Sequence, residues 1–185
     1  MKTIATFGEI MLRLSPPGSE KLFQSPVLSA RFGGGEANVA VSLALYGHPA
    51  RFISAIPAHE VGEAAVMELR KFGVDTGSIV RQGKRLGIYF ADGGANQRPS
   101  KVTYDREHSS IAEAKPGDID WDKALDGVSW FHTTGITPAI SAAAAELTRE
   151  ALQKARDKGI TVSIDFNYRG KLWKYGKTAP EVMRE

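Results

Sequence analysis

The chain has 185 residues, of which 42% are hydrophobic and 24% are charged, so it is long enough to bury a core within one domain plus a small appendage. Its formal net charge is +3, without any long run of lysine and arginine, which argues against a nucleic-acid partner and fits a small anionic ligand. It contains no cysteine, which excludes disulfides, thiolate metal sites and thiol nucleophiles and makes the cytoplasm the expected location.

The sequence contains no segment of the kind that crosses a membrane. Its start carries one lysine and then a short apolar stretch that reaches Gly8 and Glu9, too short for the apolar region of a signal peptide. Elsewhere no apolar run approaches ~18 residues, the length that a membrane-spanning helix needs. We therefore expect no membrane partner.

In the first half of the chain, short apolar runs alternate with helical patterns. Glycines at Gly47 and Gly73 stand where two of the helices would end, and glycine takes the left-handed conformation of a helix stop without strain. The alternation predicts strand, helix, strand, helix, strand. These elements cover Thr3–Phe7, Ala37–Tyr46, Arg51–Ile56, Val61–Phe72 and Ile79–Val80.

The last third of the chain continues the same alternation. Val128–His132 has the pattern of a buried strand, Ser141 is placed to cap an alanine-rich helix that reaches Lys158 and Gly159, and Ile160–Asp165 has the pattern of the next strand. Together with the first half, this predicts an α/β fold in which an open parallel sheet is flanked by helices.

Two segments interrupt this pattern, at residues 12–32 and 83–106. The first carries Pro16, Pro17, Gly18 and Pro26; the second has short β-type stretches on either side of a Gly93-Gly94 turn. These stretches are Leu86–Ala91 and Lys101–Tyr104. Strands from both segments would make a small second sheet, a lid over the C-terminal strand ends where ligands of α/β folds bind. The alternative is that they are only surface hairpins.

The densest motif is Gly33-Gly34-Gly35, which runs directly into a predicted helix. Because glycine has no Cβ, a ligand can approach this backbone closely, and the helix presents its unpaired N–H groups to a polar ligand. A dinucleotide fingerprint needs a third glycine where Asn38 stands, in the first βα turn of the chain. NAD binding is therefore excluded at this turn.

Two other candidate sites are weak. Gly170–Thr178 resembles a phosphate-binding loop, but five residues instead of four separate its glycines, and large side chains would crowd the phosphate. The histidines have no metal-ligand spacing with one another, so we expect no metal site. They are His48, His59, His108 and His132.

At Gly33–Gly47 the sequence resembles the ribokinase/PfkB family of carbohydrate kinases, whose first signature is a glycine-rich turn followed by Asn and a helix of small residues. The stretches Arg51–Ile56, His59–Gly62 and Leu69–Thr76 resemble the family in the same order. The resemblance implies a ribokinase-like sheet with a lid. Glu36, where the wider family has a small residue, resembles the 2-keto-3-deoxygluconate kinase branch.

The branch assignment depends mainly on Asp165–Trp173, which resembles a conserved stretch of the keto-deoxy-sugar-acid kinases, and on Tyr104-Asp105-Arg106. A sugar acid carries a carboxylate, and an arginine fork matches a carboxylate with two charge-assisted hydrogen bonds. Without the resemblance, Arg106 would be a solvated charge beside Asp105 and Glu107, and Arg169 a partner of Asp165. With it, both arginines are expected at the site.

The resemblance implies a role for individual residues. Gly34 and Asn38 would hold sugar hydroxyls, and Tyr89 and Tyr104 would line the pocket from the lid. Ile136 would close one wall. Arg106 and Arg169 would bind the substrate carboxylate. Asn167 and Arg169 would face the phosphate. Arg169 is therefore expected either at the substrate or at the phosphate.

In this family the catalytic base and the phosphate cradle belong to a later Asp-Thr-x-Gly-Ala-Gly-Asp segment, which does not occur in this sequence. The resemblance therefore implies the N-terminal, substrate-binding portion of a kinase that phosphorylates 2-keto-3-deoxygluconate with ATP and Mg²⁺, with no catalytic residue among the residues present. The alternatives are a fructokinase-like sugar kinase and a non-catalytic sugar-binding or dimerising fragment. The lid contains Ile88, Tyr89, Phe90 and Val102, and its open edge suggests a homodimer.

Overall fold

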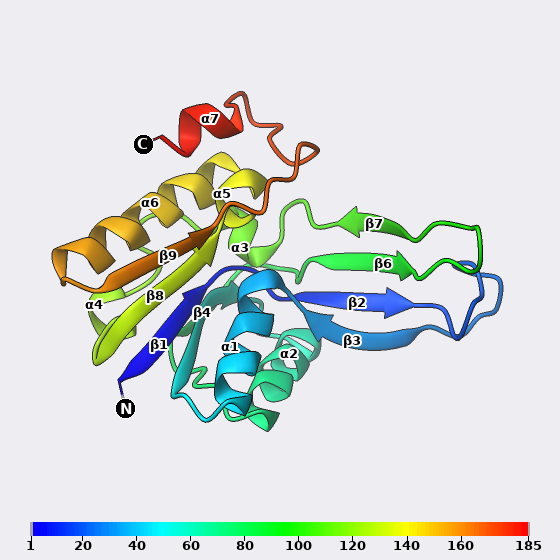
Figure 1. Ribbon diagram of the computed structural model, residues 1–185, viewed down its shortest axis with the longest axis horizontal. Helices are drawn as coiled ribbons and strands as arrows, with labels where there is room; N and C mark the ends of the chain where they lie inside the picture. Colours follow the sequence, from blue (N-terminus) through cyan, green and yellow to red (C-terminus); the bar gives the residue numbers. More distant parts are fainter. Residues whose placement is uncertain (1, 185) are drawn as a thin grey trace.

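The computed structural model describes residues 2–184 and contains two sheets that lie side by side (Figure 1). The larger sheet has five parallel strands in the order β5-β4-β1-β8-β9. They are β1 (Thr3–Phe7), β4 (Ala50–Ile56), β5 (Ile79–Arg81), β8 (Val128–Thr134) and β9 (Thr161–Asp165). Because the strands are parallel, their C-terminal ends share one edge, which Figure 1 shows facing the smaller sheet.

Helices cover both faces of the larger sheet and make it the middle of three layers. One face carries α1 (Gly35–Leu45) and α2 (Glu60–Lys71); the other carries α3 (Ser110–Glu113), α4 (Trp121–Ala124) and the long α6 (Ala142–Asp157) (Figure 1). Two short helices, α5 (Thr137–Ile140) and α7 (Ala179–Val182), follow β8 and the loop after β9. The α/β fold with an open parallel sheet flanked by helices is confirmed.

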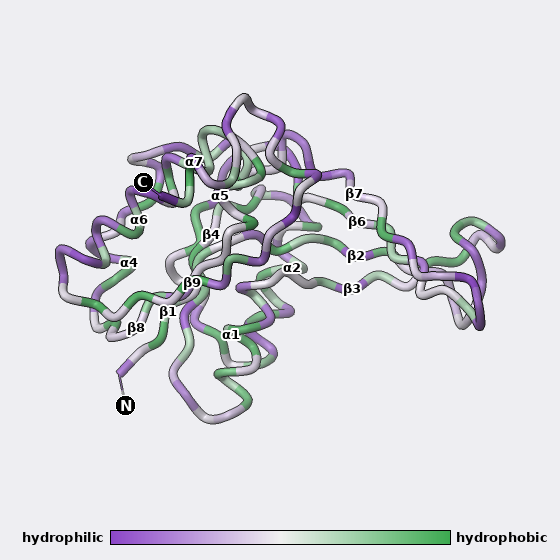
Figure 2. Tube along the Cα trace, turned by 45° about the horizontal axis from the view of Figure 1, so that its top comes forward, coloured by the Kyte–Doolittle hydropathy of each residue, from purple (hydrophilic) through white to green (hydrophobic). Residues whose placement is uncertain are grey.

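The two faces of the sheet bury separate apolar cores. Phe52 and Ile56 of β4 pack with Leu69 towards α1 and α2, whereas Phe7 and Phe131 pack towards α6. Strands β1 and β4 are largely apolar, whereas β8 ends on the polar residues His132, Thr133 and Thr134. Figure 2 shows hydrophobic and hydrophilic residues alternating along α6, as expected of a helix with one buried face. This packing holds the C-terminal strand ends in place beneath the lid.

The predicted elements agree with the structure apart from their ends. Gly47 and Gly73 have φ values of +81° and +80°, the left-handed conformation expected of helix stops. Ser141 caps α6, because its Oγ accepts a hydrogen bond from the Ala144 N–H at 3.0 Å. Helix α1 begins at Gly35 rather than Ala37, so the last glycine of the motif is its first helical residue.

The interrupting segments form one four-stranded lid sheet in the order β3-β2-β6-β7. Its strands are β2 (Met11–Ser15), β3 (Ser29–Gly33), β6 (Ile88–Asp92) and β7 (Lys101–Asp105). Two antiparallel pairs are joined through the parallel pairing of β2 with β6. The segments are therefore not separate surface hairpins. No helix within residues 2–184 is both long and apolar enough to cross a membrane.

Candidate functional site

The glycine turn, Gly33–Gly35, connects the lid sheet to α1 at the edge where the parallel strands end. Gly34 has an extended backbone, with φ −172° and ψ 156°, which any residue can adopt. Its constraint is space, because a Cβ there would overlap the carbonyl oxygen of Glu9. The turn therefore lies directly on the backbone that leaves β1.

Side chains from α1, β6, β8 and the loop after β9 approach the glycine turn. A Cβ on Gly33 would lie 3.4 Å from the Tyr89 hydroxyl and 3.6 Å from Asn38 Oδ1. A Cβ on Gly35 would lie 3.7 Å from the Thr134 methyl group and 4.0 Å from the Asn167 amide nitrogen. The structure thus brings together four of the residues predicted for the site, which are Gly34, Asn38, Tyr89 and Asn167.

The lid contributes two tyrosines and an arginine that lie in contact. Tyr89 and Tyr104 are opposite one another on β6 and β7, and their ring centroids are 5.9 Å apart. The guanidinium carbon of Arg106 lies 5.5 Å from the centre of the Tyr104 ring, within the range of a cation–π contact. These three predicted residues form a continuous strip on the lid.

Arg106 is held at the junction between the two sheets. Its side chain is 8% exposed, and its Nη2 donates a hydrogen bond to Glu9 Oε2 in a buried ion pair. Ser109 Oγ donates to the other oxygen, Glu9 Oε1, at 2.8 Å. The expectation that the charge pattern alone gave, a solvated arginine beside Asp105 and Glu107, is wrong.

One N–H of Arg106 remains without a protein acceptor. Its Nε is buried and has no hydrogen-bond partner among residues 2–184. A buried donor without an acceptor costs free energy, so the position favours a ligand oxygen. Gly87 leaves room for this ion pair, because a Cβ there would overlap Glu9 Oε1 and press on the Arg106 side chain.

The remaining predicted residues lie on the loops that follow β8 and β9. The Ile136 N–H donates to Thr134 Oγ1 at 3.1 Å. Arg169 is exposed, and its Nη1 lies 3.5 Å from the carbonyl oxygen of the preceding residue, Tyr168. The carboxylate of Asp165 accepts from the Asn167 N–H at 3.0 Å, and the described residues include no ion pair between Asp165 and Arg169. Among residues 2–184, Arg169 and Arg106 share no hydrogen-bond partner.

Two buried carboxylates lie beneath the site, and the sequence pattern did not indicate that they were buried. Glu9 is 3% exposed and Glu36 is 1% exposed. Burial raises the pKa of Glu36, and hydrogen bonds from the Thr134 and Thr137 hydroxyls oppose this increase. A related feature of the sequence is the glycine at position 8, because a Cβ there would overlap the Glu36 carboxylate in the structure.

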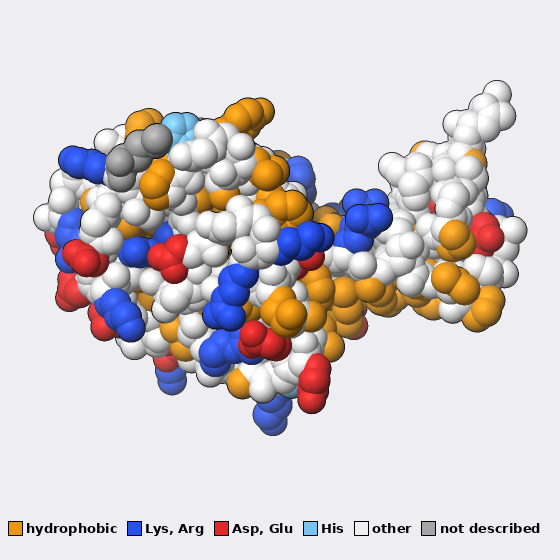
Figure 3. Space-filling model, turned by 90° about the horizontal axis from the view of Figure 1, so that it is seen from below, with side chains coloured by type: hydrophobic (Ala, Val, Ile, Leu, Met, Phe, Trp, Pro, Cys, Tyr) orange, Lys and Arg blue, Asp and Glu red, His pale blue; other side chains and the backbone are white. Residues whose placement is uncertain are grey.

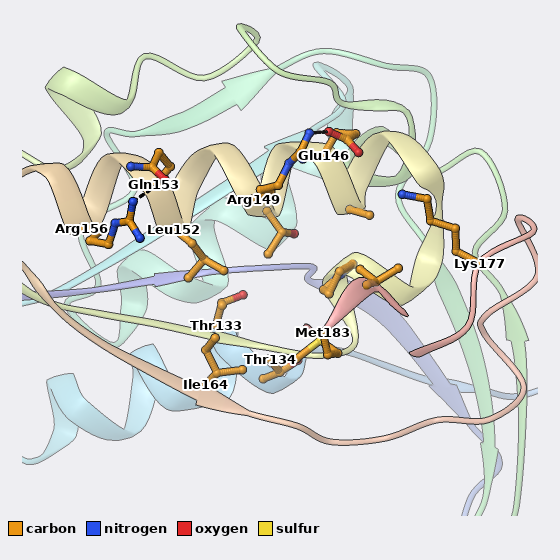
Figure 4. Close-up of a pocket in the computed structure, with 14 residues that line it drawn as sticks. Thr133, Thr134, Glu146, Arg149, Leu152, Gln153, Arg156, Ile164, Lys177 and Met183 are labelled. Atoms are coloured by element: carbon orange, nitrogen blue, oxygen red, sulfur yellow. Dashed lines mark hydrogen bonds and ion pairs between the residues drawn. The ribbon is translucent and has the colours of Figure 1, made fainter. Parts of the chain in front are cut away.

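A separate cavity of about 250 Å³ lies between α6, β9 and the segment carrying α7 (Figure 4). Its walls are largely apolar and include Leu152, Ile164 and Met183. At its rim, Arg149 pairs with Glu146, as Figure 4 shows. Its lining also includes polar side chains, but the predicted residues Gly34, Asn38, Tyr89 and Asn167 lie together at the glycine turn, so we place the candidate site there.

The described residues contain no group of three or more His, Asp or Glu side chains that could hold a metal ion. His132 Nδ1 lies 2.9 Å from Ser163 Oγ, and burial lowers the pKa of this histidine. His108 is exposed beside Glu113, with Nδ1 3.1 Å from its carboxylate. Both histidines therefore interact with neighbouring polar side chains.

Comparison with known proteins gives consistent matches along the whole chain. Residues 1–184 match the model of the pfkB family carbohydrate kinases. A 2-dehydro-3-deoxygalactonokinase of Haloferax volcanii is 39% identical over 170 residues, which are 92% of this chain and 53% of that protein.

Solved structures give the same result. The crystal structure of a 2-dehydro-3-deoxygluconokinase from Thermotoga maritima is 52% identical, with a TM-score of 0.91 over 94% of this chain and 53% of that one. An uncharacterized sugar kinase from Pyrococcus horikoshii in complex with ATP is 25% identical, with a TM-score of 0.79 over 98% of this chain and 58% of that one. The chain spans about half the length of the relatives it matches.

Proposed function

The chain belongs to the PfkB family of carbohydrate kinases, and from this we propose that it binds a sugar acid of the 2-keto-3-deoxygluconate type at the glycine turn. In the full-length enzyme that sugar would be phosphorylated with ATP and Mg²⁺. The observation that carries the proposal is Arg106, a buried arginine with an unpartnered Nε beside the tyrosine strip of the lid.

The arrangement suits an acidic ligand better than a neutral one. The Arg106 Nε is a charged donor in a site of low solvent access, where its hydrogen bond to a carboxylate is stronger than its bond to a hydroxyl. Asn38, Gly34 and Tyr89 supply amide, backbone and phenol groups at the turn, and these suit sugar hydroxyls. The names of the relatives from Haloferax volcanii and Thermotoga maritima, which refer to keto-deoxy sugar acids, agree with this choice.

Phosphoryl transfer needs groups beyond this sugar pocket. ATP would supply the transferred phosphoryl group, and Asn167 and Arg169 after β9 are the residues of this chain proposed to face it. The described residues do not provide a cluster of acidic side chains for Mg²⁺. The proposed role of this chain is therefore to bind and orient the sugar acid.

Calorimetry with 2-keto-3-deoxygluconate, fructose and ribose tests the proposal. We expect the sugar acid to bind at least about tenfold more tightly than either neutral sugar, since a charge-assisted hydrogen bond contributes about 1.5–3 kcal/mol. Arg169→Gln should reduce this preference if Arg169 contacts the carboxylate. Lys171→Gln, on the same exposed loop, removes an equal charge and should leave it unchanged. Equal binding of the neutral sugars would refute the acid-sugar assignment.

A homodimer through the lid is part of the same proposal. Strand β7 is exposed along its whole length and forms an edge of the lid sheet. Figure 3 shows hydrophobic side chains gathered along one face of the lid, and exposed apolar residues of the lid include Phe23 and Val102. Ile88, Tyr89 and Phe90 are only partly exposed. An open edge with apolar neighbours favours pairing with a second copy.

Sedimentation velocity tests the dimer. We expect a dimer that Val102→Asp converts to a monomer, because the substitution places a charge beside the open edge. Met67→Asp, on the exposed side of α2, introduces the same charge away from the lid and should leave the dimer intact. A wild-type chain that stays monomeric at high concentration would rule out the lid interface.

A further inference from the structure

Glu36 is buried beneath the glycine turn, and neither sugar binding nor packing explains why a hydrogen-bond acceptor stands there. We propose that Glu36 is a positioning residue, which holds the backbone of Ile136 against the glycine turn through the hydroxyl of Thr134. This inference rests on the proposed function, since Ile136 is the residue expected to close one wall of the sugar pocket.

Glu36 is fixed at both its backbone and its side chain. Its carbonyl oxygen accepts a hydrogen bond from Thr6 Oγ1 at 3.0 Å, which ties the first turn of α1 to β1. Its Oε1 accepts from Thr134 Oγ1 at 2.7 Å and from Thr137 Oγ1 at 3.2 Å. The residue therefore joins the start of α1 to the segment that connects β8 with α5.

The environment of the carboxylate makes a packing role a poor explanation. Glu36 is 1% exposed, and an acid in such a place costs free energy that an apolar residue would avoid. Arg106 forms its ion pair with Glu9, whose negative charge adds to the burial effect that raises the Glu36 pKa. Gly8 must also lack a side chain to leave room for the carboxylate.

The hydrogen bonds at Thr134 run in one direction. A threonine hydroxyl has a single proton, and here it is donated to Glu36 Oε1. The oxygen of the same hydroxyl then presents its lone pairs to the Ile136 N–H, which donates to it at 3.1 Å. The position of the carboxylate thus sets the hydroxyl, and the hydroxyl sets the Ile136 amide.

Thr137 provides a matched comparison within the same cluster. Its hydroxyl reaches the same oxygen, Glu36 Oε1, and its side chain is as deeply buried as that of Thr134. The hydrogen bonds of the structure link Ile136 to Thr134 and not to Thr137 within the described residues. If Glu36 acts through the amide of Ile136, the two threonines differ in effect; if Glu36 is only a structural residue, they do not.

The test compares Thr134→Val with Thr137→Val, each of which replaces one buried hydroxyl by a methyl group. Thermal melts first establish a temperature at which both variants are folded. We expect Thr134→Val to lower the hydrogen-exchange protection of the Ile136 amide about tenfold, because that amide loses its acceptor. Affinity for 2-keto-3-deoxygluconate should fall by a similar factor of about ten. Thr137→Val should change both quantities less than about twofold.

Substitutions at Glu36 complete the test. Glu36→Gln keeps a carbonyl oxygen for the Thr134 hydroxyl and should preserve both the amide protection and the affinity, whereas Glu36→Ala should lose both. Equal effects of the two threonine variants, or full affinity in Thr134→Val, would overturn the proposal. Amide protection is measured without sugar, so a chain that binds no sugar would refute the proposed function while still testing the role of Glu36.

Discussion

Replacing Arg106 by methionine is expected to lower the free energy of unfolding by about 3–5 kcal/mol, because the carboxylate of Glu9 would remain buried without its cation. Both side chains of this pair are at least nine-tenths buried. Methionine keeps most of the length of the arginine stem, so little of the loss comes from a cavity. Urea denaturation monitored by circular dichroism measures it. The same variant should lose its preference for a sugar acid over fructose.

Two controls separate the buried charge from general effects of the substitution. Arg85→Met removes a neighbouring arginine whose pair with Asp105 is partly exposed, at 2.8 Å, and should cost less than about 1 kcal/mol. The double variant Glu9→Met with Arg106→Met removes both charges and should recover most of the stability. If Arg106→Met costs no more than Arg85→Met, the ion pair does not hold the junction between the sheets.

Gly34→Ala is expected to be the most damaging single methyl group in the chain. The new Cβ would overlap the backbone carbonyl of Glu9, and backbone on both sides of the contact cannot move without shifting β1 or α1. We expect a loss of about 3 kcal/mol in the free energy of unfolding and a loss of about a hundredfold in affinity for the sugar acid, since the turn would be displaced.

The control for this substitution is Gly93→Ala in the lid. A Cβ at Gly93 would meet open space, so its effect on stability should stay within about 0.5 kcal/mol, and its effect on affinity should be negligible. Chemical denaturation and calorimetry on the two variants give the comparison. Equal stability and equal sugar affinity of Gly34→Ala and Gly93→Ala would mean that the glycine turn can accommodate a side chain at Gly34.

Local patterns predicted the elements of this fold well. The strand Thr3–Phe7, the strand expected at Ile79–Val80 and the long helix after Ser141 were each predicted from apolar residues within the segment itself. The short helices α3 and α5 were missed because each has four residues, less than the length over which helical periodicity can be recognised. Their position depends on packing with α6 instead.

The candidate site could be predicted only in part, because many of its contacts join residues far apart in the sequence. The glycine motif indicated a close approach of backbone, and the structure shows that approach at Gly34. The burial of Arg106 was not predictable, because its partner Glu9 is 97 residues away in the sequence, and only the meeting of the two sheets brings them together. Glu36 departs from the pattern of the wider family, but its threonine partners lie about as far along the chain, at separations of 98 and 101 residues.

The lid is joined to the rest of the molecule by four chain crossings, and this determines how it can move. They lie between β1 and β2, between β3 and α1, between β5 and β6, and between β7 and α3. These crossings follow the ends of β1 and β5 and precede the starts of α1 and α3. A rotation of the lid would therefore pull on these four points together, which restrains it more than a loop with two attachments.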